Sequence, residues 1–201
     1  AILSLMVQSP SLLERINQGG VIGYLIISVG IIGLLLVLER SVVLSLMQST
    51  MKSQQKGINL SKDSPLMRLK AVATNQSTMD SETLALKLDQ AILKERPYIK
   101  QFLSTLAVFA AIAPLLGLLG TVSGMIETFQ AITLFGTGDP KLMSGGISIA
   151  LVTTELGLVI AIPLVLLHSW ISGQAKAVLF ILDEESAAQV ASREEMQHAN
   201  V

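Results

Sequence analysis

The stretch that decides the fold is A-P-L-L-G-L-L-G-T-V-S-G-M-I-E-T-F, at Ala113–Phe129. It lies within residues 101–126, a run that contains no charged side chain. About 20 apolar residues span the hydrocarbon core of a bilayer, so the run predicts a transmembrane helix. One side of it is made of glycines and hydroxyl residues, a surface that favours close packing against another helix over contact with lipid. Its members are Gly117, Gly120 and Gly124, at spacings of +3 and +4, with Thr121 and Ser123 beside them.

The composition of the whole chain is that of a membrane protein. Of its 201 residues 51% are hydrophobic and 14% charged, and the mean hydropathy is +0.62, too apolar for an ordinary soluble domain. The net charge of −1 gives no positive electrostatic potential that would attract nucleic acid. The absence of Cys excludes disulfides and thiolate metal sites. We therefore expect membrane lipids as partners, no nucleic acid, no metal and no cofactor. Because the chain begins with Ala1, we expect it to be processed or truncated.

Hydropathy divides the chain into seven segments. Apolar runs predict three spans, and Ser9 and Pro10 are typical of a helix start ahead of the first one. The expected organisation is an N-terminal periplasmic interfacial amphipathic helix at 1–20, transmembrane helices at 21–40, 101–133 and 142–171, a cytoplasmic helical region at 41–100, a periplasmic turn at 134–141 and a cytoplasmic C-terminal helix at 172–201.

Charges set the expected orientation. Twelve of the fourteen Lys and Arg residues lie in residues 40–100 or after residue 171. The positive-inside rule therefore places the C-terminus in the cytoplasm and the N-terminus on the outer side of the membrane.

The polar segment between spans one and two carries an apolar stripe at a helical period. The stripe continues into span two and predicts one long helix that leaves the membrane, with Pro97 as a kink. Because a helix in water needs a partner for such a stripe, we expect self-association.

Span three contains a second stripe of small residues within G-G-I-S-I-A-L-V-T-T-E-L-G-L-V-I-A-I-P, at Gly145–Pro163. Thr121 and Thr154 are the hydroxyl positions on the two stripes, which makes them candidates for lining a pore or a helix interface. The alternative is that each hydroxyl bonds a carbonyl of its own helix. The helix-packing candidates are Gly117, Gly120 and Gly124 in span two, and Gly146, Ala150 and Gly157 in span three.

Glu155 is the one carboxylate in the middle of a span. An ionisable group there costs several kcal/mol unless it faces protein or water. We expect Glu155 to handle ions or protons, with an interhelical hydrogen bond that fixes packing as the alternative.

The motifs at Ala113–Ile126 and Gly146–Pro163 resemble the ExbB/TolQ/MotA proton-channel family, and the T-T-E variant of ExbB most of all. The resemblance implies an all-α inner-membrane protein with three transmembrane helices, long cytoplasmic helical extensions and five subunits around a central pore. Two ExbD-like single-span subunits would occupy that pore, and proton flow would energise a TonB-like protein for outer-membrane import. Thr121 and Thr154 match threonines that line the pore in such proteins. Many relatives carry a glutamate at the position where this chain has Ile149. In this chain the only acidic residue in the middle of a span is instead Glu155.

Several alternatives stay open. A TolQ-like subunit of the Tol-Pal system would share the architecture, whereas a flagellar stator would have four spans. An intramembrane serine protease built on Ser123 and His168 is disfavoured, because Thr121 replaces the first glycine of G-x-S-G. A passive scaffold would use the small faces for packing alone. The expected function is that of a proton-channel subunit, not an enzyme, with the proton as coupling ion.

Overall fold

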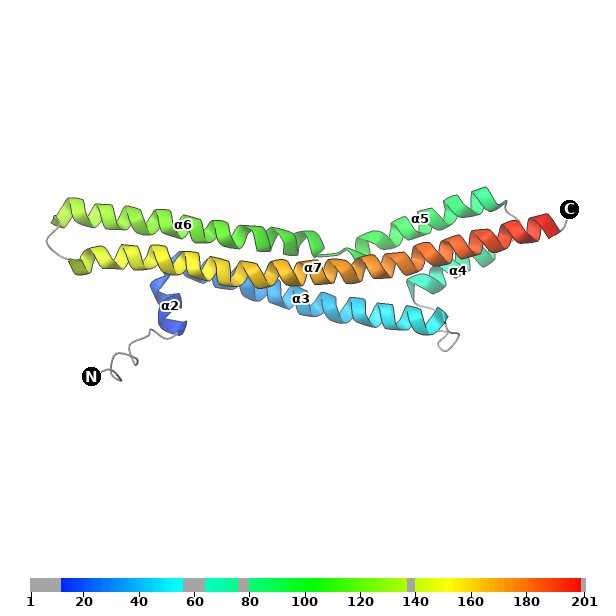
Figure 1. Cartoon of the computed structure of the whole chain (residues 1–201), viewed down its shortest axis with the longest axis horizontal. Helices are drawn as coiled ribbons and strands as arrows, with labels where there is room; N and C mark the ends of the chain where they lie inside the picture. The colour runs from blue at the N-terminus through cyan, green and yellow to red at the C-terminus, as the bar shows by residue number, and fades with distance from the viewer. Residues whose placement is uncertain (1–11, 56–63, 76–79, 137–139, 200–201) are drawn as a thin grey trace. The chain divides into compact units, whose positions relative to one another are not determined.

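The computed structural model describes residues 12–55, 64–75, 80–136 and 140–199, and every regular element in these ranges is an α-helix. The expected all-α class is therefore confirmed. The expected helix start at Ser9 and Pro10 lies outside the described residues, as do residues 137–139 of the expected periplasmic turn. The helices are α2 (Leu12–Gln18), α3 (Gly20–Gln55), α4 (Pro65–Asn75), α5 (Ser81–Ile99), α6 (Leu103–Phe135) and α7 (Pro140–Ala199), as Figure 1 shows.

Three helical stretches, in α3, α6 and α7, are long and apolar enough to cross a membrane. Pro114 and Pro163 lie inside α6 and α7 without ending them, as membrane helices tolerate. Only 22–28% of the most apolar windows is buried within the chain. Most of this surface is therefore left for lipid or for other subunits.

The chain divides into two compact units. The apolar unit comprises Ala1–Leu36 and Thr105–His168, and the polar unit comprises Val37–Ser104 and Ser169–Val201. The boundaries between the units fall inside α3, α6 and α7.

In the apolar unit, α3 packs along α7 through glycines. Gly20 has a φ of +57°, which a glycine adopts without strain, and it separates α2 from α3. The contacts advance in the same direction along both helices, so α3 and this part of α7 run parallel. The pairs are Gly23 with Leu156, Gly30 with Ile160 and Gly33 with Leu164.

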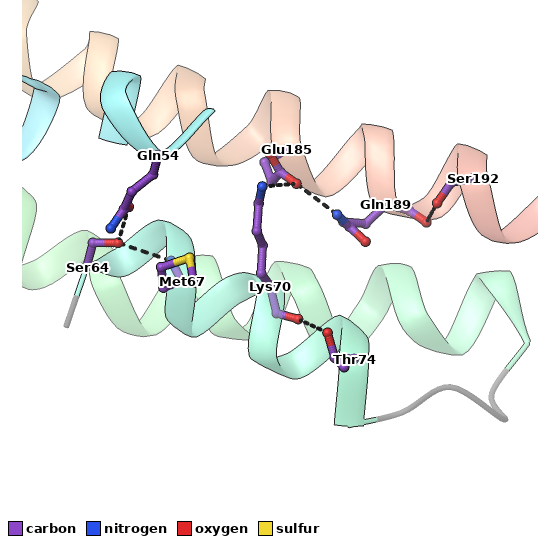
Figure 2. A network of polar contacts seen from close by, with 8 residues as sticks. All are labelled: Gln54, Ser64, Met67, Lys70, Thr74, Glu185, Gln189 and Ser192. Atoms are coloured by element: carbon purple, nitrogen blue, oxygen red, sulfur yellow. Dashed lines mark hydrogen bonds and ion pairs between the residues drawn. The ribbon is translucent and has the colours of Figure 1, made fainter. Parts of the chain in front are cut away.

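In the polar unit, the ends of α3 and α7 pack with α4 and α5 around an apolar core. Its periphery is polar: Lys70 of α4 pairs with Glu185 of α7 at 3.3 Å, and Ser64 bonds Gln54, as Figure 2 shows. The apolar stripes that we expected to need a second subunit are thus covered within the chain. The core includes Leu44, Met51, Leu66, Leu69, Leu84, Leu88, Ile92, Ile99, Ile171, Val178 and Leu182.

The expectation of one long helix from the polar region into span two is wrong. α5 ends at Ile99 and α6 begins at Leu103, with Phe102 in the left-handed region at a φ of 62°. Arg40 of α3, only 3% exposed, stabilises the turn by donating 2.8 Å hydrogen bonds to the carbonyls of Tyr98 and Gln101. Periodicity alone does not reveal this break, because Leu103 continues the stripe of α5.

Candidate functional site

The glycines of α6 bring its backbone into contact with α7. A Cβ added at Gly117 would lie 3.0 Å from the carbonyl oxygen of Thr153 and 3.2 Å from the Cα of Thr154. At Gly120 it would overlap the side chain of Thr153, and at Gly124 it would lie 2.8 Å from the backbone nitrogen of Ala150. These distances are below ordinary van der Waals contact, so the α6 face fits α7 only without side chains. Figure 1 shows the two helices side by side in this unit.

The α7 side of the interface is equally small. A Cβ at Gly157 would lie 2.8 Å from the carbonyl oxygen of Ala113, and one at Gly146 would lie 2.9 Å from the backbone nitrogen of Thr128. Ala150 is 4% exposed. The structure therefore places all six helix-packing candidates at one interface between α6 and α7.

Thr153 is a member of this interface that the sequence analysis missed. Its side chain is fully buried over Gly120, and its Oγ1 donates to the carbonyl of Ile149 at 2.8 Å. A signal was present in the sequence. The steps +4, +3, +4 from Gly146 through Ala150 and Thr153 to Gly157 fit a helical period as well as the chosen steps through Thr154 do.

Thr154 lies at the edge of the same interface and is half-buried. Its Oγ1 is 3.2 Å from the carbonyl oxygen of Ala150 in its own helix and 3.4 Å from that of Gly117 in α6. The hydroxyl thus bridges the two helices while its side chain keeps part of its surface exposed. It can still accept a hydrogen bond from a water or from another subunit.

Thr121 is also half-buried, and its Oγ1 donates a 2.6 Å hydrogen bond to the carbonyl of Leu118. The back-bond leaves the oxygen lone pairs available as acceptors. Thr121 comes directly after Gly120 on α6 and is therefore turned by about 100° from the glycine contact with Thr153. It lies beside the interface rather than within it.

Glu155 faces a different neighbour. Its Oε1 lies 2.6 Å from Nη1 of Arg15 in α2, with the two side chains 49% and 36% exposed, respectively. Because Leu156 contacts Gly23 near the start of α3, this ion pair lies at the level where the apolar stretch of α3 begins. The carboxylate is therefore turned away from the Thr154 bridge and toward the N-terminal segment.

Arg15 is the second site residue that the sequence analysis missed. It lies in the expected interfacial helix at 1–20, and no contact with Glu155 was predicted for it. The two members of the pair are 140 positions apart in the chain, and no local pattern links them. In the described ranges, no group of three or more His, Cys, Asp or Glu side chains is placed to hold a metal ion. The chemistry available here is that of hydroxyls, backbone carbonyls and one paired carboxylate.

Comparison with known proteins finds matches across both motifs. The MotA/TolQ/ExbB proton channel family matches residues 45–184, which include Thr121, Thr154 and Glu155. A Methanothermobacter thermautotrophicus protein named as an ExbB homolog of biopolymer transport is 33% identical over 180 residues, covering 82% of this chain and 64% of that protein.

Two further relatives match shorter segments. A Synechocystis protein named as ExbB-like is 38% identical over 104 residues, which cover 50% of this chain and 49% of that protein. The biopolymer transport protein exbB1 of Vibrio cholerae is 40% identical over 73 residues, covering 36% of this chain and 32% of that protein. The chain thus spans between about a third and two thirds of the length of these relatives. With the family match extending over more than half of its residues, the chain belongs to the MotA/TolQ/ExbB proton channel family.

Proposed function

We propose that the chain is a subunit of an inner-membrane proton channel that uses the proton motive force to energise a TonB-like protein for outer-membrane import. In this proposal five copies surround the membrane helices of two ExbD-like subunits. Family membership supports a role in proton conduction rather than in catalysis. The ExbB names of the matched relatives favour this assignment over a TolQ-like subunit of the Tol-Pal system.

The observation that carries the proposal is the paired helix wall of α6 and α7. Its glycines hold the backbones of α6 and α7 in contact. Thr121 and Thr154 lie at the edge of this wall with their oxygens free to accept hydrogen bonds. A wall of this kind suits a hydrated passage, because it presents polar atoms without weakening the helix pair.

The wall requires a partner to conduct protons. Hydroxyls and one carboxylate, Glu155, form an incomplete relay across about 30 Å of hydrocarbon. Arg15 occupies Oε1 of Glu155, and Oε2 remains to receive a proton or a hydrogen bond. A second titratable group would come from the single-span partner. One charge that crosses the membrane gains about 2.3 kcal/mol per 100 mV, which is enough to bias a conformational step.

The proposed orientation follows from charge. Twelve of fourteen basic residues fall in residues 40–100 or after residue 171, and the positive-inside rule assigns these segments to the cytoplasm. The N-terminus then lies in the periplasm.

The test is proton flux in vesicles that contain the chain together with its single-span partner. We expect Thr154→Val and Thr121→Val to lower flux about tenfold, because losing one hydrogen bond of about 1–1.5 kcal/mol along the path costs that factor. Thr153→Val is the matched control, since its hydroxyl bonds only its own helix and its side chain is fully buried. Equal flux in all three variants, with assembly intact, would support a passive scaffold instead.

A further inference from the structure

The polar unit carries an acidic groove between α5 and α7. It has a volume of about 520 Å³, and small side chains, Ala85 and Ala187 among them, form part of its lining. Three carboxylates line it, from Asp89, Asp183 and Glu194, and no Lys or Arg does. The groove therefore concentrates negative charge on one side of this unit.

The polar groups that line the groove have no partner among the described residues. Among the residues that the structure describes, none of the three carboxylates forms an ion pair or a hydrogen bond. Ser186, which also lines the groove, is only 7% exposed and likewise has no hydrogen-bond partner in the described ranges. Three carboxylates and one hydroxyl without described partners give the groove the properties of a surface that a basic group completes.

The complementary charge lies on the opposite side of α5. A second hollow, of about 360 Å³ between α4 and α5, has a lining that includes three basic residues, Lys87, Lys94 and Arg68, and one acidic residue, Glu95. Arg68 is engaged by Glu95 at 2.8 Å, whereas the two lysines form no ion pair with any described residue. At 100° per residue, Lys87 and Lys94 lie roughly 160° around the helix from Asp89 and Ala85. One helix thus presents acid to one side and base to the other.

We propose that the acidic groove binds the basic α4–α5 face of a second copy of this chain, with Lys87 and Lys94 of that copy placed against Asp89, Asp183 and Glu194. In such a contact each copy uses its acidic groove toward one neighbour and its basic face toward the other. A head-to-tail contact of this kind generates a ring when the rotation from one copy to the next closes on itself. The inference rests on the proposed homo-oligomer and assigns it a contact outside the membrane. The complementarity found on a single chain favours a second copy over an unrelated basic protein.

The first test is cysteine cross-linking of the full-length chain in native membranes. The sequence contains no Cys, so every cross-link reports an introduced pair. Ala187→Cys places a thiol in the lining of the acidic groove, and Gln90→Cys places one on the basic face. We expect a ladder of cross-linked oligomers from the double variant and none from either single variant. A dimer from Ala187→Cys alone would indicate a symmetric contact, and a cross-link to a different protein would identify another occupant. Either result would overturn the proposal.

The second test reverses charge. Asp89→Lys with Asp183→Lys should lower the yield of the ladder at low salt at least about tenfold, because like charges then face each other. Adding Lys87→Glu and Lys94→Glu to the same chain should restore it. The matched control is Glu184→Lys with Glu195→Lys, two exposed positions about 100° around α7 from the groove.

Native mass measurement separates failure of this contact from failure of the proposed function. An intact oligomer without the ladder would overturn the groove contact alone. A monomeric chain in the native membrane extract would contradict the proposed channel subunit itself.

Discussion

Gly124→Ala tests the packing of α6 against α7 with the smallest possible change. The new Cβ would lie 2.8 Å from the backbone nitrogen of Ala150, and still closer to the carbonyl oxygen of Gly146. Ordinary contact begins at 3.4 Å, so the two backbones must separate by about 0.6 Å at Ala150 alone. Both neighbours are backbone atoms, and no rotamer change can relieve the overlap.

Overpacking of this kind costs about 1–3 kcal/mol. Alanine also gains up to about 1 kcal/mol of helix propensity over glycine, which would hide part of the effect. Gly145→Ala is the matched control, because Gly145 is helical in α7 and nothing lies within 4 Å of its added Cβ. The difference between the two variants isolates the packing cost.

The assay is reversible unfolding of the purified protein in mixed detergent, followed by circular dichroism. We expect Gly124→Ala to be less stable than Gly145→Ala by about 1–3 kcal/mol. Equal stability of the two variants would refute the close approach of α6 and α7 at this level.

Three further changes test other contacts. Arg40→Met should destabilise the chain by about 1.5–3 kcal/mol in the same assay, because two backbone carbonyls at the turn lose a buried charged donor, and a loss under about 0.5 kcal/mol would contradict that role. In a double-mutant cycle, Arg15→Gln and Glu155→Gln should show a coupling energy of at most about 1 kcal/mol, and less at high salt, because both side chains are more than a third exposed. A larger coupling energy would show that the ion pair is shielded from water. Hydrogen bonds from the Thr83 side chain and then its backbone lower the pKa of Asp80, so its contribution to the start of α5 is present above the ordinary Asp pKa and is lost as pH falls through the folded-state pKa. The protection factors of the amides in the first turn of α5 should therefore fall on acidification in the wild type and be low already at neutral pH in Asp80→Ala, and identical profiles would contradict the cap.

Much of the apolar architecture could be predicted because it depends on local composition. Apolar runs of sufficient length identify the three spans without any tertiary information. The stripe from Leu84 to Ile99 likewise identified the face of α5 that is buried. The turn at Phe102 was not predicted, because it depends on a buried side chain from another helix, Arg40, rather than on a helix-breaking residue at the turn itself.

The candidate site was harder to predict than the spans. The small residues of span three fit a helical period with either Thr153 or Thr154 on their face. Only the packing of Thr153 against Gly120 shows which of the two threonines lies at the centre of the interface. The partner of Glu155 is Arg15, whose position depends on how α2 folds back on α7. Sequence periodicity reports which face of a helix is apolar or small, but it does not report what lies opposite.

The central claim is that the edge of the α6–α7 wall faces water in the assembled channel. The most direct measurement is the reaction of Thr121→Cys with a small, membrane-impermeant thiol reagent in the native complex, since the chain has no Cys of its own. Leu119→Cys is the control, because it lies two residues away and about 160° around the same helix. We predict that Thr121→Cys reacts from the aqueous phase and that Leu119→Cys does not. An unreactive Thr121→Cys beside a reactive Leu119→Cys would contradict the account.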